Sequence, residues 1–282
     1  MKQRADDFLG VVRIHLAAEG FKVKRFFHFN YCSGGWFQNV AGTMNRRGTV
    51  RRGRSDAIFE SNLNTRPFVT ELADLQTRLL EMGGLVESAI ATSLLWLVEG
   101  REAPSAEIWT VENRINQLNI EIDEVAIRLT ALHQPVAKDL RFLTAAIKIN
   151  SDLERMGDLV VNVAERASSL QQSAPPKPGI DVPRMSQLVQ SMVRRSLDAF
   201  VRRDEEMAKA VLAADDEVDE LKDSVYRELL EKADRGEYPV KAAFDLIFVA
   251  HNLERIADHA TNIAEDVLFL VKGVDVRHHH AE

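Results

Sequence analysis

Pairs of carboxylate residues four positions apart recur along this chain. They are Glu154 with Asp158, Glu254 with Asp258, and Asp215 with Asp219, and Glu112 with Asn116 stands where a fourth pair would be. On a helix, residues four apart project from one face, where two like charges cost a few tenths of a kcal/mol. A bound cation would offset that cost. Carboxylates converging from two adjacent helices form a hard, oxygen-rich site of the kind that Mg, Mn, Ca or iron ions prefer.

The carboxylate pairs belong to an internal repeat. Residues 151–166 (SDLERMGDLVVNVAER) and 251–266 (HNLERIADHATNIAED) are identical at 7 of 16 positions. Residues 111–122 align with 214–225 at a slightly different offset, which pairs Asn116 with Asp219. Such recurrence indicates a duplicated unit. Because the amide of Asn116 carries no charge, the site in the first half should be weaker or differently populated.

Apolar residues at three- and four-residue spacing predict amphipathic helices over most of the chain. Prolines divide the first half into three such helices, and a proline-rich stretch separates it from the second half, where Asp204 is a candidate N-cap. Helices are expected there at about 184–202, 204–235 and 239–272. The predicted fold class is all-α, with two homologous three-helix bundles of six long helices related by a pseudo-twofold repeat.

The first 60 residues differ in composition from the rest. They hold 11 Lys and Arg against 5 Asp and Glu, whereas residues 61–282 hold 25 against 38. Clustered arginines beside aromatic residues suit a nucleic-acid or anionic-membrane arm, but the lack of helical or strand periodicity favours a disordered extension or an over-long reading frame. The predicted organisation is an irregular basic extension at 1–60, a first three-helix repeat at 61–174, a Pro-rich linker at 175–183, a second three-helix repeat at 184–274 and a tail at 275–282.

Several functional classes are excluded by composition and by missing motifs. A single Cys rules out disulfide scaffolds and thiolate metal cages. The chain has no phosphate-binding loop, dinucleotide fingerprint, nucleophile elbow or His-Glu-x-x-His motif. No His follows a Glu by three residues, which counts against di-iron oxidase chemistry. Because no apolar run is long enough to span a bilayer, we expect a soluble protein.

Other interpretations of the same residues stay open. Acidic residues on helices usually form a solvated face, and Arg155 and Arg255 could neutralise the carboxylates in place of a metal. Asn162 and Asn262 could hydrogen-bond to the metal ligands without contacting the metal, or they could fix the packing of helices. His259 is expected as an interhelical hydrogen-bonding residue rather than a catalyst. Four related pairs in register across two repeats favour metal binding over a plain acidic surface.

Longer motifs surround the carboxylate pairs. They are MGGLVE at 82–87, HQPVAKDLR at 133–141, DLERMGD at 152–158, NLERIAD with HATNIAED at 252–266, and VKGVDVRH at 271–278. Together they resemble the PhoU family of phosphate-uptake regulators over about residues 65–280. The resemblance implies two similar three-helix bundles whose E(D)-x-x-x-D motifs carry metal clusters, with Fe, Mn, Mg or Zn as the candidate ions. The implied ligands are Glu154, Asp158, Glu254, Asp258, Asp215 and Asp219, with Glu112 and Asn116 as a degenerate fourth pair.

The resemblance implies regulation rather than catalysis. PhoU proteins act with the phosphate ABC transporter and with the sensor histidine kinase of the phosphate two-component system, which they hold off when phosphate is plentiful. We therefore expect a non-enzymatic, metal-binding adaptor in the cytoplasm, recruited to the inner face of the membrane by that kinase and by the ATPase subunit of the transporter. A homodimer is expected and a nucleic-acid partner is not. The rival hypotheses are a carboxylate-bridged metalloenzyme on a helical bundle and a purely structural helical module.

Overall fold

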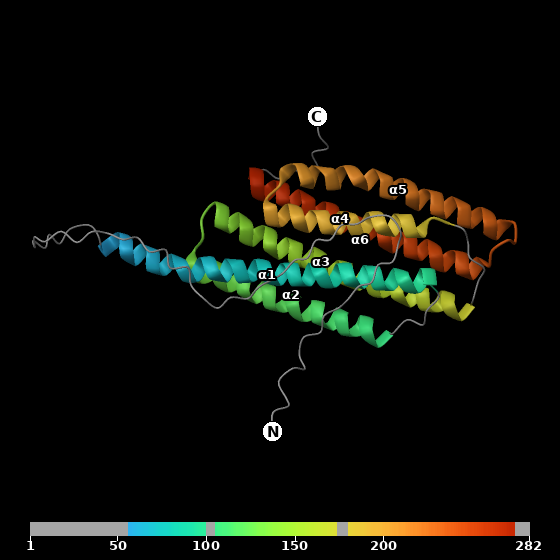
Figure 1. The fold of residues 1–282 in the computed structure, drawn as a ribbon, viewed down its shortest axis with the longest axis horizontal. Coiled ribbons are helices and arrows are strands. Elements are labelled where there is room, and N and C mark those ends of the chain that lie inside the picture. The colour runs from blue at the N-terminus through green and yellow to red at the C-terminus, as the bar shows by residue number, and fades with distance from the viewer. Residues whose placement is uncertain (1–55, 100–104, 174–179, 274–282) are drawn as a thin grey trace, which may run out of the picture. The chain divides into compact units, whose positions relative to one another are not determined.

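The computed structural model describes residues 56–99, 105–173 and 180–273, which form helices and short connections without a strand. The helices are α1 (Asp56–Glu99), α2 (Ser105–His133), α3 (Lys138–Ser173), α4 (Val182–Arg202), α5 (Glu205–Asp234) and α6 (Val240–Lys272) (Figure 1). The predicted all-α class with six long helices is confirmed. Most of the predicted basic extension, the predicted tail and most of the Pro-rich linker lie outside the described residues.

Two helices begin before the predicted starts of the repeats. Helix α1 starts at Asp56, within the segment predicted as the extension, and α4 starts at Val182, within the predicted linker. The start of α4 has a local cause, since an oxygen of Asp181 accepts a hydrogen bond from the backbone N–H of Arg184 over 3.2 Å. Such an N-cap satisfies a donor that the first turn of a helix leaves open.

Local hydrogen bonds also fix the turns of the second repeat. A side-chain oxygen of Asp204 accepts a hydrogen bond from the N–H of Met207 over 3.0 Å, so the predicted N-cap of α5 is confirmed. Helix α6 ends at Lys272 and is capped by Gly273, whose φ of 72° lies in the left-handed region that favours glycine. The N–H of Gly273 donates to the carbonyl of Phe269 over 2.8 Å, and this bond closes the last turn.

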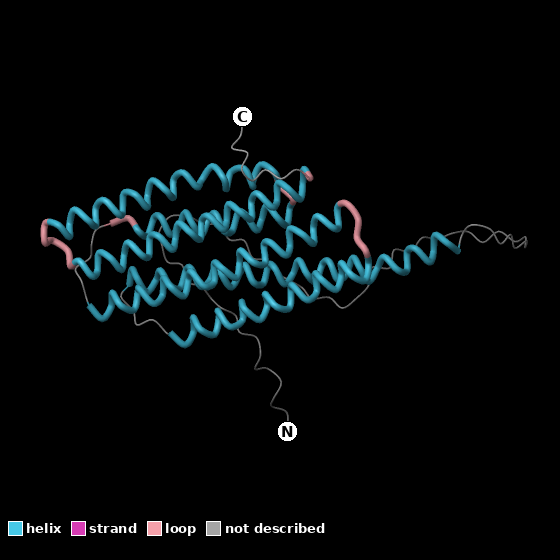
Figure 2. The backbone as a smooth tube through the Cα atoms, turned by 180° about the vertical axis from the view of Figure 1, so that it is seen from behind, coloured by secondary structure: helices cyan, strands magenta, loops and turns pink. Residues whose placement is uncertain are grey.

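Each half of the described chain is a unit of three helices. Helix α2 packs only on α1 and α3, and α5 packs only on α4 and α6, among the helices described. Contacts of α3 with α6 and of α1 with α4 join the two units. All six helix axes run side by side along one direction (Figure 2). Helices α3 and α6 are antiparallel, because Lys148 near the start of α3 pairs with Asp266 near the end of α6.

The apolar stripes predicted from spacing form the core of these units. Leu75, Leu79 and Met82 of α1 are completely buried, and Leu118 and Ile122 of α2 are completely buried against them and α3. Burying side chains of this size contributes about 1.5–3 kcal/mol each to folding. The stripes therefore fix the rotation of each helix and leave its polar residues at the outer faces and in the grooves between helices.

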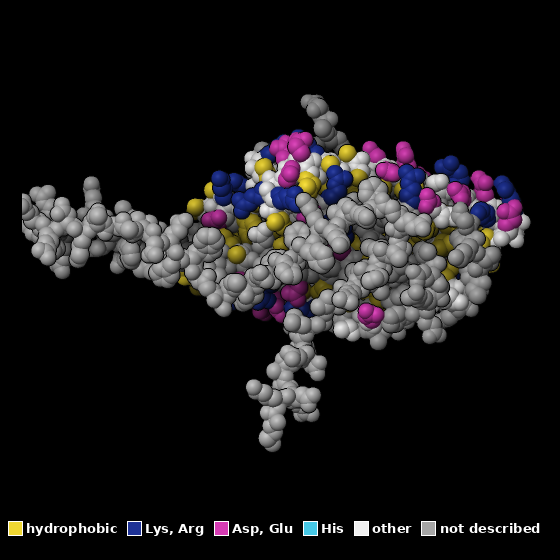
Figure 3. Space-filling view, in the orientation of Figure 1, with side chains coloured by type: hydrophobic (Ala, Val, Ile, Leu, Met, Phe, Trp, Pro, Cys, Tyr) yellow, Lys and Arg dark blue, Asp and Glu magenta, His cyan; other side chains and the backbone are white. Residues whose placement is uncertain are grey.

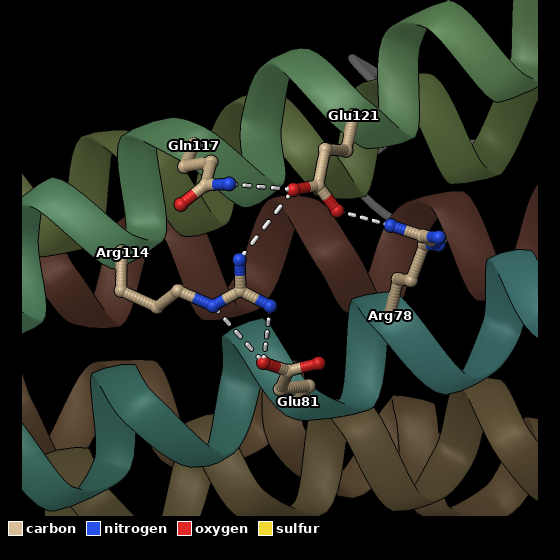
Figure 4. A network of polar contacts seen from close by, with 5 residues as sticks. All are labelled: Arg78, Glu81, Arg114, Gln117 and Glu121. Carbon is tan, nitrogen blue, oxygen red and sulfur yellow. Dashed lines mark hydrogen bonds and ion pairs between the residues drawn. The ribbon is translucent and has the colours of Figure 1, made fainter.

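Charged side chains cover the outside of α5 and the contact of α1 with α2. Lys, Arg, Asp and Glu alternate over α5 (Figure 3). In the contact of α1 with α2, Arg114 lies between two glutamates, donating to Glu81 over 2.7 Å and to Glu121 over 3.5 Å (Figure 4). Arg78 and Gln117 also bind Glu121. None of the described helices combines the length and apolar character that crossing a bilayer requires.

Candidate functional site

The first acidic cluster lies where α2 packs on α3. It contains Glu112 of α2 and Glu154 and Asp158 of α3. The side-chain amide of Asn116 donates a hydrogen bond to Oε1 of Glu112 over 2.7 Å. Burial raises the pKa of Glu154, and the charges of Asp158 and Glu112 raise it further, whereas Arg155 opposes them. Glu154 therefore lies within electrostatic reach of both other carboxylates, as the helical spacing predicts.

The second acidic cluster lies where α5 packs on α6, and it contains one carboxylate more. Asp215 and Asp219 come from α5, and Glu254 and Asp258 come from α6. Burial raises the pKa of Asp215 to about 6, with the charges of Asp258 and Asp219 adding to the effect. Burial also raises the pKa of Asp258, and Glu254 and Asp219 contribute. The four carboxylates thus repel one another, with Asp215 and Glu254 partly buried and Asp219 and Asp258 exposed.

Lys222 places a positive charge inside the second cluster. Its ammonium lies 2.7 Å from Oδ1 of Asp219 on its own helix and 2.9 Å from Oε1 of Glu254 on α6. Burial by itself lowers the pKa of Lys222, but the bonds to these two carboxylates outweigh burial and raise it. His251 approaches the other oxygen of Glu254 at 3.5 Å. One oxygen of Glu254 is therefore already engaged by the ammonium of Lys222.

His259 lies between the two clusters and connects the two repeats. Its Nδ1 is 2.8 Å from Oδ1 of Asp152, and the amide of Asn262 donates to the same oxygen over 3.2 Å. Both His259 and Asn262 belong to α6, whereas Asp152 belongs to α3. The positive charge that His259 can carry lowers the pKa of Glu154 in one cluster and of Asp258 in the other. The interhelical role predicted for His259 is confirmed, and Asn262 serves helix packing.

The sequence-based prediction did not include Lys222 or Asp152. The repeat alignment contained a signal for both, because Lys222 aligns with Asn119 and Asp152 aligns with Asn252. At each of these two positions one repeat has a charged residue and the other has an asparagine, although the carboxylates nearby are shared. A change of charge between otherwise similar repeats therefore marks the residues that make the two clusters different.

The residues present suit a hard metal ion in their chemistry. All seven predicted ligands lie in the two clusters: Glu112, Glu154 and Asp158 in the first, and Asp215, Asp219, Glu254 and Asp258 in the second. They offer only oxygen donors, and burial together with the neighbouring carboxylates raises the pKa of Glu154, Asp215 and Asp258, an effect that a cation would oppose. Among the residues described, no three Asp, Glu, His or Cys side chains are already gathered as a ligand set. Metal binding would require side chains such as Glu254 to leave their present partners.

Fold and clusters together define a class of protein. It is an all-helical protein of two homologous three-helix repeats, each with an acidic cluster between its second and third helices. The PhoU domain matches residues 79–167 and 182–267, once in each repeat. The chain belongs to the PhoU family, and the resemblance seen in its motifs is confirmed.

Relatives and solved structures agree with this assignment. The chain is 37% identical over 212 residues to the phosphate-specific transport system accessory protein PhoU homolog of Pseudomonas aeruginosa, covering 75% of this chain and 88% of the relative. It is 40% identical over 206 residues to the protein of the same name from Zymomonas mobilis, covering 73% and 87%. The crystal structure of PhoU from Pseudomonas aeruginosa superposes with a TM-score of 0.70 at 36% identity, covering 73% of this chain and all of the other. That of the regulatory protein PhoU from Streptococcus pneumoniae gives 0.69 at 28% identity, covering 74% and 99%.

Proposed function

We propose that this protein is a regulatory accessory protein of a phosphate-specific transport system. The observation that carries the proposal is its match across both repeats to relatives that bear this name, over 88% of the length of one and 87% of another. The architecture is consistent with a docking protein, since its long helices present outer faces to solvent and its polar clusters lie in grooves between helices. Such a protein acts by binding one state of its partner more tightly than another.

The proposed partners are the sensor histidine kinase of the phosphate two-component system and the ATPase subunit of the phosphate ABC transporter. The protein would work from the cytoplasm, at the inner face of the membrane, and repress the starvation response when phosphate is abundant. Deletion of the gene tests this role with a reporter on a phosphate-starvation promoter. We expect high reporter expression in abundant phosphate and restored repression when the full chain is supplied. Unchanged expression in the deletion strain would contradict the proposal.

We also propose that the two acidic clusters bind divalent or iron ions. Glu112, Glu154 and Asp158 would hold metal in the first repeat, and Asp215, Asp219, Glu254 and Asp258 in the second. A bound ion would offset the mutual repulsion of these carboxylates. In its absence the chain's own residues must limit the repulsion, and Asn116, Lys222 and His259 do so through the contacts described above.

Elemental analysis of the purified protein tests metal binding. The matched variant replaces Glu154, Asp158, Glu254 and Asp258 with alanine. We expect metal at a fixed ratio in the parent and its loss in the variant, with the helical circular dichroism of both preserved. If the unmutated protein holds no metal after incubation with iron, manganese, magnesium or zinc, metal binding is contradicted and the proposed regulatory role is unaffected. The expected homodimer is tested on the same samples by light scattering.

A further inference from the structure

We propose that Lys222 is a built-in counter-cation of the second acidic cluster, which competes with a metal ion for the same carboxylate oxygens and lowers the metal affinity of that cluster. The inference rests on the proposed metal binding and concerns how the chain regulates it. It differs from that proposal in assigning a role to a residue that is not itself a ligand.

The contacts of Lys222 are those of a residue fixed inside the cluster. Its ammonium lies between Oδ1 of Asp219 at 2.7 Å and Oε1 of Glu254 at 2.9 Å, and so links α5 to α6. Only 19% of the Lys222 side chain and 18% of the Glu254 side chain are exposed. Pairs with this little exposure are screened less by water than surface pairs are. The ammonium therefore holds Glu254 in its present position.

The first cluster has a neutral residue at the matching position. Asn119 aligns with Lys222, and Asn116 with Asp219. In the first cluster the amide of Asn116 donates a hydrogen bond to Glu112 on the same helix, α2. This amide carries no net charge. The first cluster thus combines three carboxylates with amides, whereas the second combines four carboxylates with one ammonium. The two repeats share the acidic pairs of α3 and α6 but differ in how the charge of those pairs is balanced.

Competition follows from the chemistry of the two cations. A metal ion at the second cluster and the Lys222 ammonium both need the oxygens of Asp219 and Glu254, and a positive charge that stayed in place would repel the metal. The flexible four-carbon stem of lysine lets the ammonium move out to solvent when a metal enters. Metal binding therefore breaks both ion pairs of Lys222. In return, α5 stays paired with α6 through Lys222 when metal is scarce.

The affinity of the second cluster for Mn²⁺ tests the proposal. The parent protein for this test is the full chain with Glu154→Ala and Asp158→Ala, which disable the first cluster. Lys222→Met is then added to this parent. Free Mn²⁺ is followed by electron paramagnetic resonance after prior chelation and desalting. We expect Lys222→Met to bind Mn²⁺ about tenfold more tightly, because the ion no longer has to displace an ammonium from Asp219 and Glu254. Lys222→Gln, which keeps a polar side chain, should behave in the same way.

A matched control separates this local effect from the change in net charge. Lys209 also lies on α5, where it pairs with Glu205 and Glu206 on its own helix. Lys209→Met in the same parent should leave Mn²⁺ affinity unchanged. The converse variant, Asn119→Lys, introduces the ammonium into the first cluster of a chain that carries Glu254→Ala and Asp258→Ala. It should weaken Mn²⁺ binding there by a similar factor.

Different failures have different meanings. Equal Mn²⁺ affinity in the parent and in Lys222→Met overturns the role of Lys222 and leaves metal binding intact. Mn²⁺ binding by the unmutated chain, but by neither the parent nor its Lys222 variants, shows that the second cluster takes no metal. That result overturns the inference and the proposed metal site of the second cluster, and leaves metal binding by the first cluster intact. If no chain binds Mn²⁺, the inference and the proposed metal binding both fail. As a second readout, Mn²⁺ should raise the melting temperature of Lys222→Met more than that of the parent.

Discussion

The last helices of the two repeats, α3 and α6, share their buried apolar stripe and their carboxylate pairs but differ in other charged residues. Leu153 and Leu253 occupy matching positions and are 0% and 1% exposed. Val163 and Ile263, ten residues further along each helix, are also buried. Each three-helix unit therefore folds around the same stripe. Duplication of this stripe explains why both halves have the same architecture.

The polar differences determine how the two repeats meet. In two ion pairs along their antiparallel contact α3 supplies the cation and α6 the anion: Lys148 pairs with Asp266 at 2.8 Å and Arg166 with Asp245 at 3.5 Å. Arg166 aligns with Asp266 in the repeat, so a contact between two copies of α3 in this register would bring Arg166 to Lys148. Like charges there would be unfavourable. Charge thus favours the pairing of α3 with α6 over the pairing of either helix with itself.

Removal of matched core leucines should have the largest effect and should be equal in the two repeats. We expect Leu153→Ala and Leu253→Ala each to cost about 2–5 kcal/mol of unfolding free energy, through lost burial and the cavity left behind. Urea denaturation followed by circular dichroism measures both. The exposed Val240 of α6 provides the control, and Val240→Ala should change stability by less than about 0.5 kcal/mol. A much smaller cost for one leucine would show that the two cores are not equivalent.

Loss of the contact between Asp152 and His259 should come next. Asp152→Ala leaves the ring of His259 and the amide of Asn262 without their common acceptor, and should cost about 1–3 kcal/mol. Asp152→Asn keeps an oxygen that can accept these bonds and should recover more than half of that loss. The same denaturation assay compares the variants. Equal destabilisation by alanine and asparagine would exclude the hydrogen bonds as the cause.

The second cluster should make the metal-free protein less stable as the pH rises from about 4 to 6. The folded pKa of Asp215 is about 6, against an ordinary 3.8, so the folded chain holds this proton more tightly than the unfolded chain. Its contribution to stability is complete below the ordinary value and is lost as the pH rises through the folded one. Asp215→Asn should remove this dependence. Because the carboxyl is partly exposed and screened by water, the variant should gain only about 1 kcal/mol at pH 7.

Thermal melts in EDTA over this pH range measure the effect of Asp215→Asn. Asp223→Asn, at an exposed position of the same helix, removes the same charge outside the cluster and should leave the pH dependence unchanged. An Asp215→Asn protein that loses stability between pH 4 and pH 6 as steeply as the parent would assign the dependence to other carboxylates.

The smallest effect is expected at the outer ion pairs of the two repeats. Arg114 contacts both Glu81 and Glu121 in the first repeat, whereas Arg184 makes one ion pair, with Glu217, at 2.9 Å in the second. Arg114→Ala should cost about 0.5–1 kcal/mol and Arg184→Ala less than about 0.5 kcal/mol, because both arginines are substantially exposed. Both costs should shrink at high ionic strength. A larger cost for Arg184→Ala would reverse this ranking.

Most of the fold could be predicted from the sequence, because its signals are local. The spacing of apolar residues predicted the six helices, Asp204 marked the start of α5, and the repeat of Glu154 with Asp158 at Glu254 with Asp258 indicated duplication. These features depend on the period of the helix and on backbone groups a few residues away. The same period placed the carboxylates of each pair on one helical face, and the structure brings carboxylates of adjacent helices together in two clusters.

Tertiary structure decided how charge is balanced in the two acidic clusters. Lys222 reaches Glu254 across 32 residues of sequence, and His259 reaches Asp152 across 107. The period of a helix fixes which face a side chain occupies, but it does not specify which residue of a neighbouring helix lies opposite. That depends on how the buried stripes of α3, α5 and α6 set the position of one helix along another. The sequence therefore determined where negative charge gathers, and only the packing of the helices decided which cation meets it.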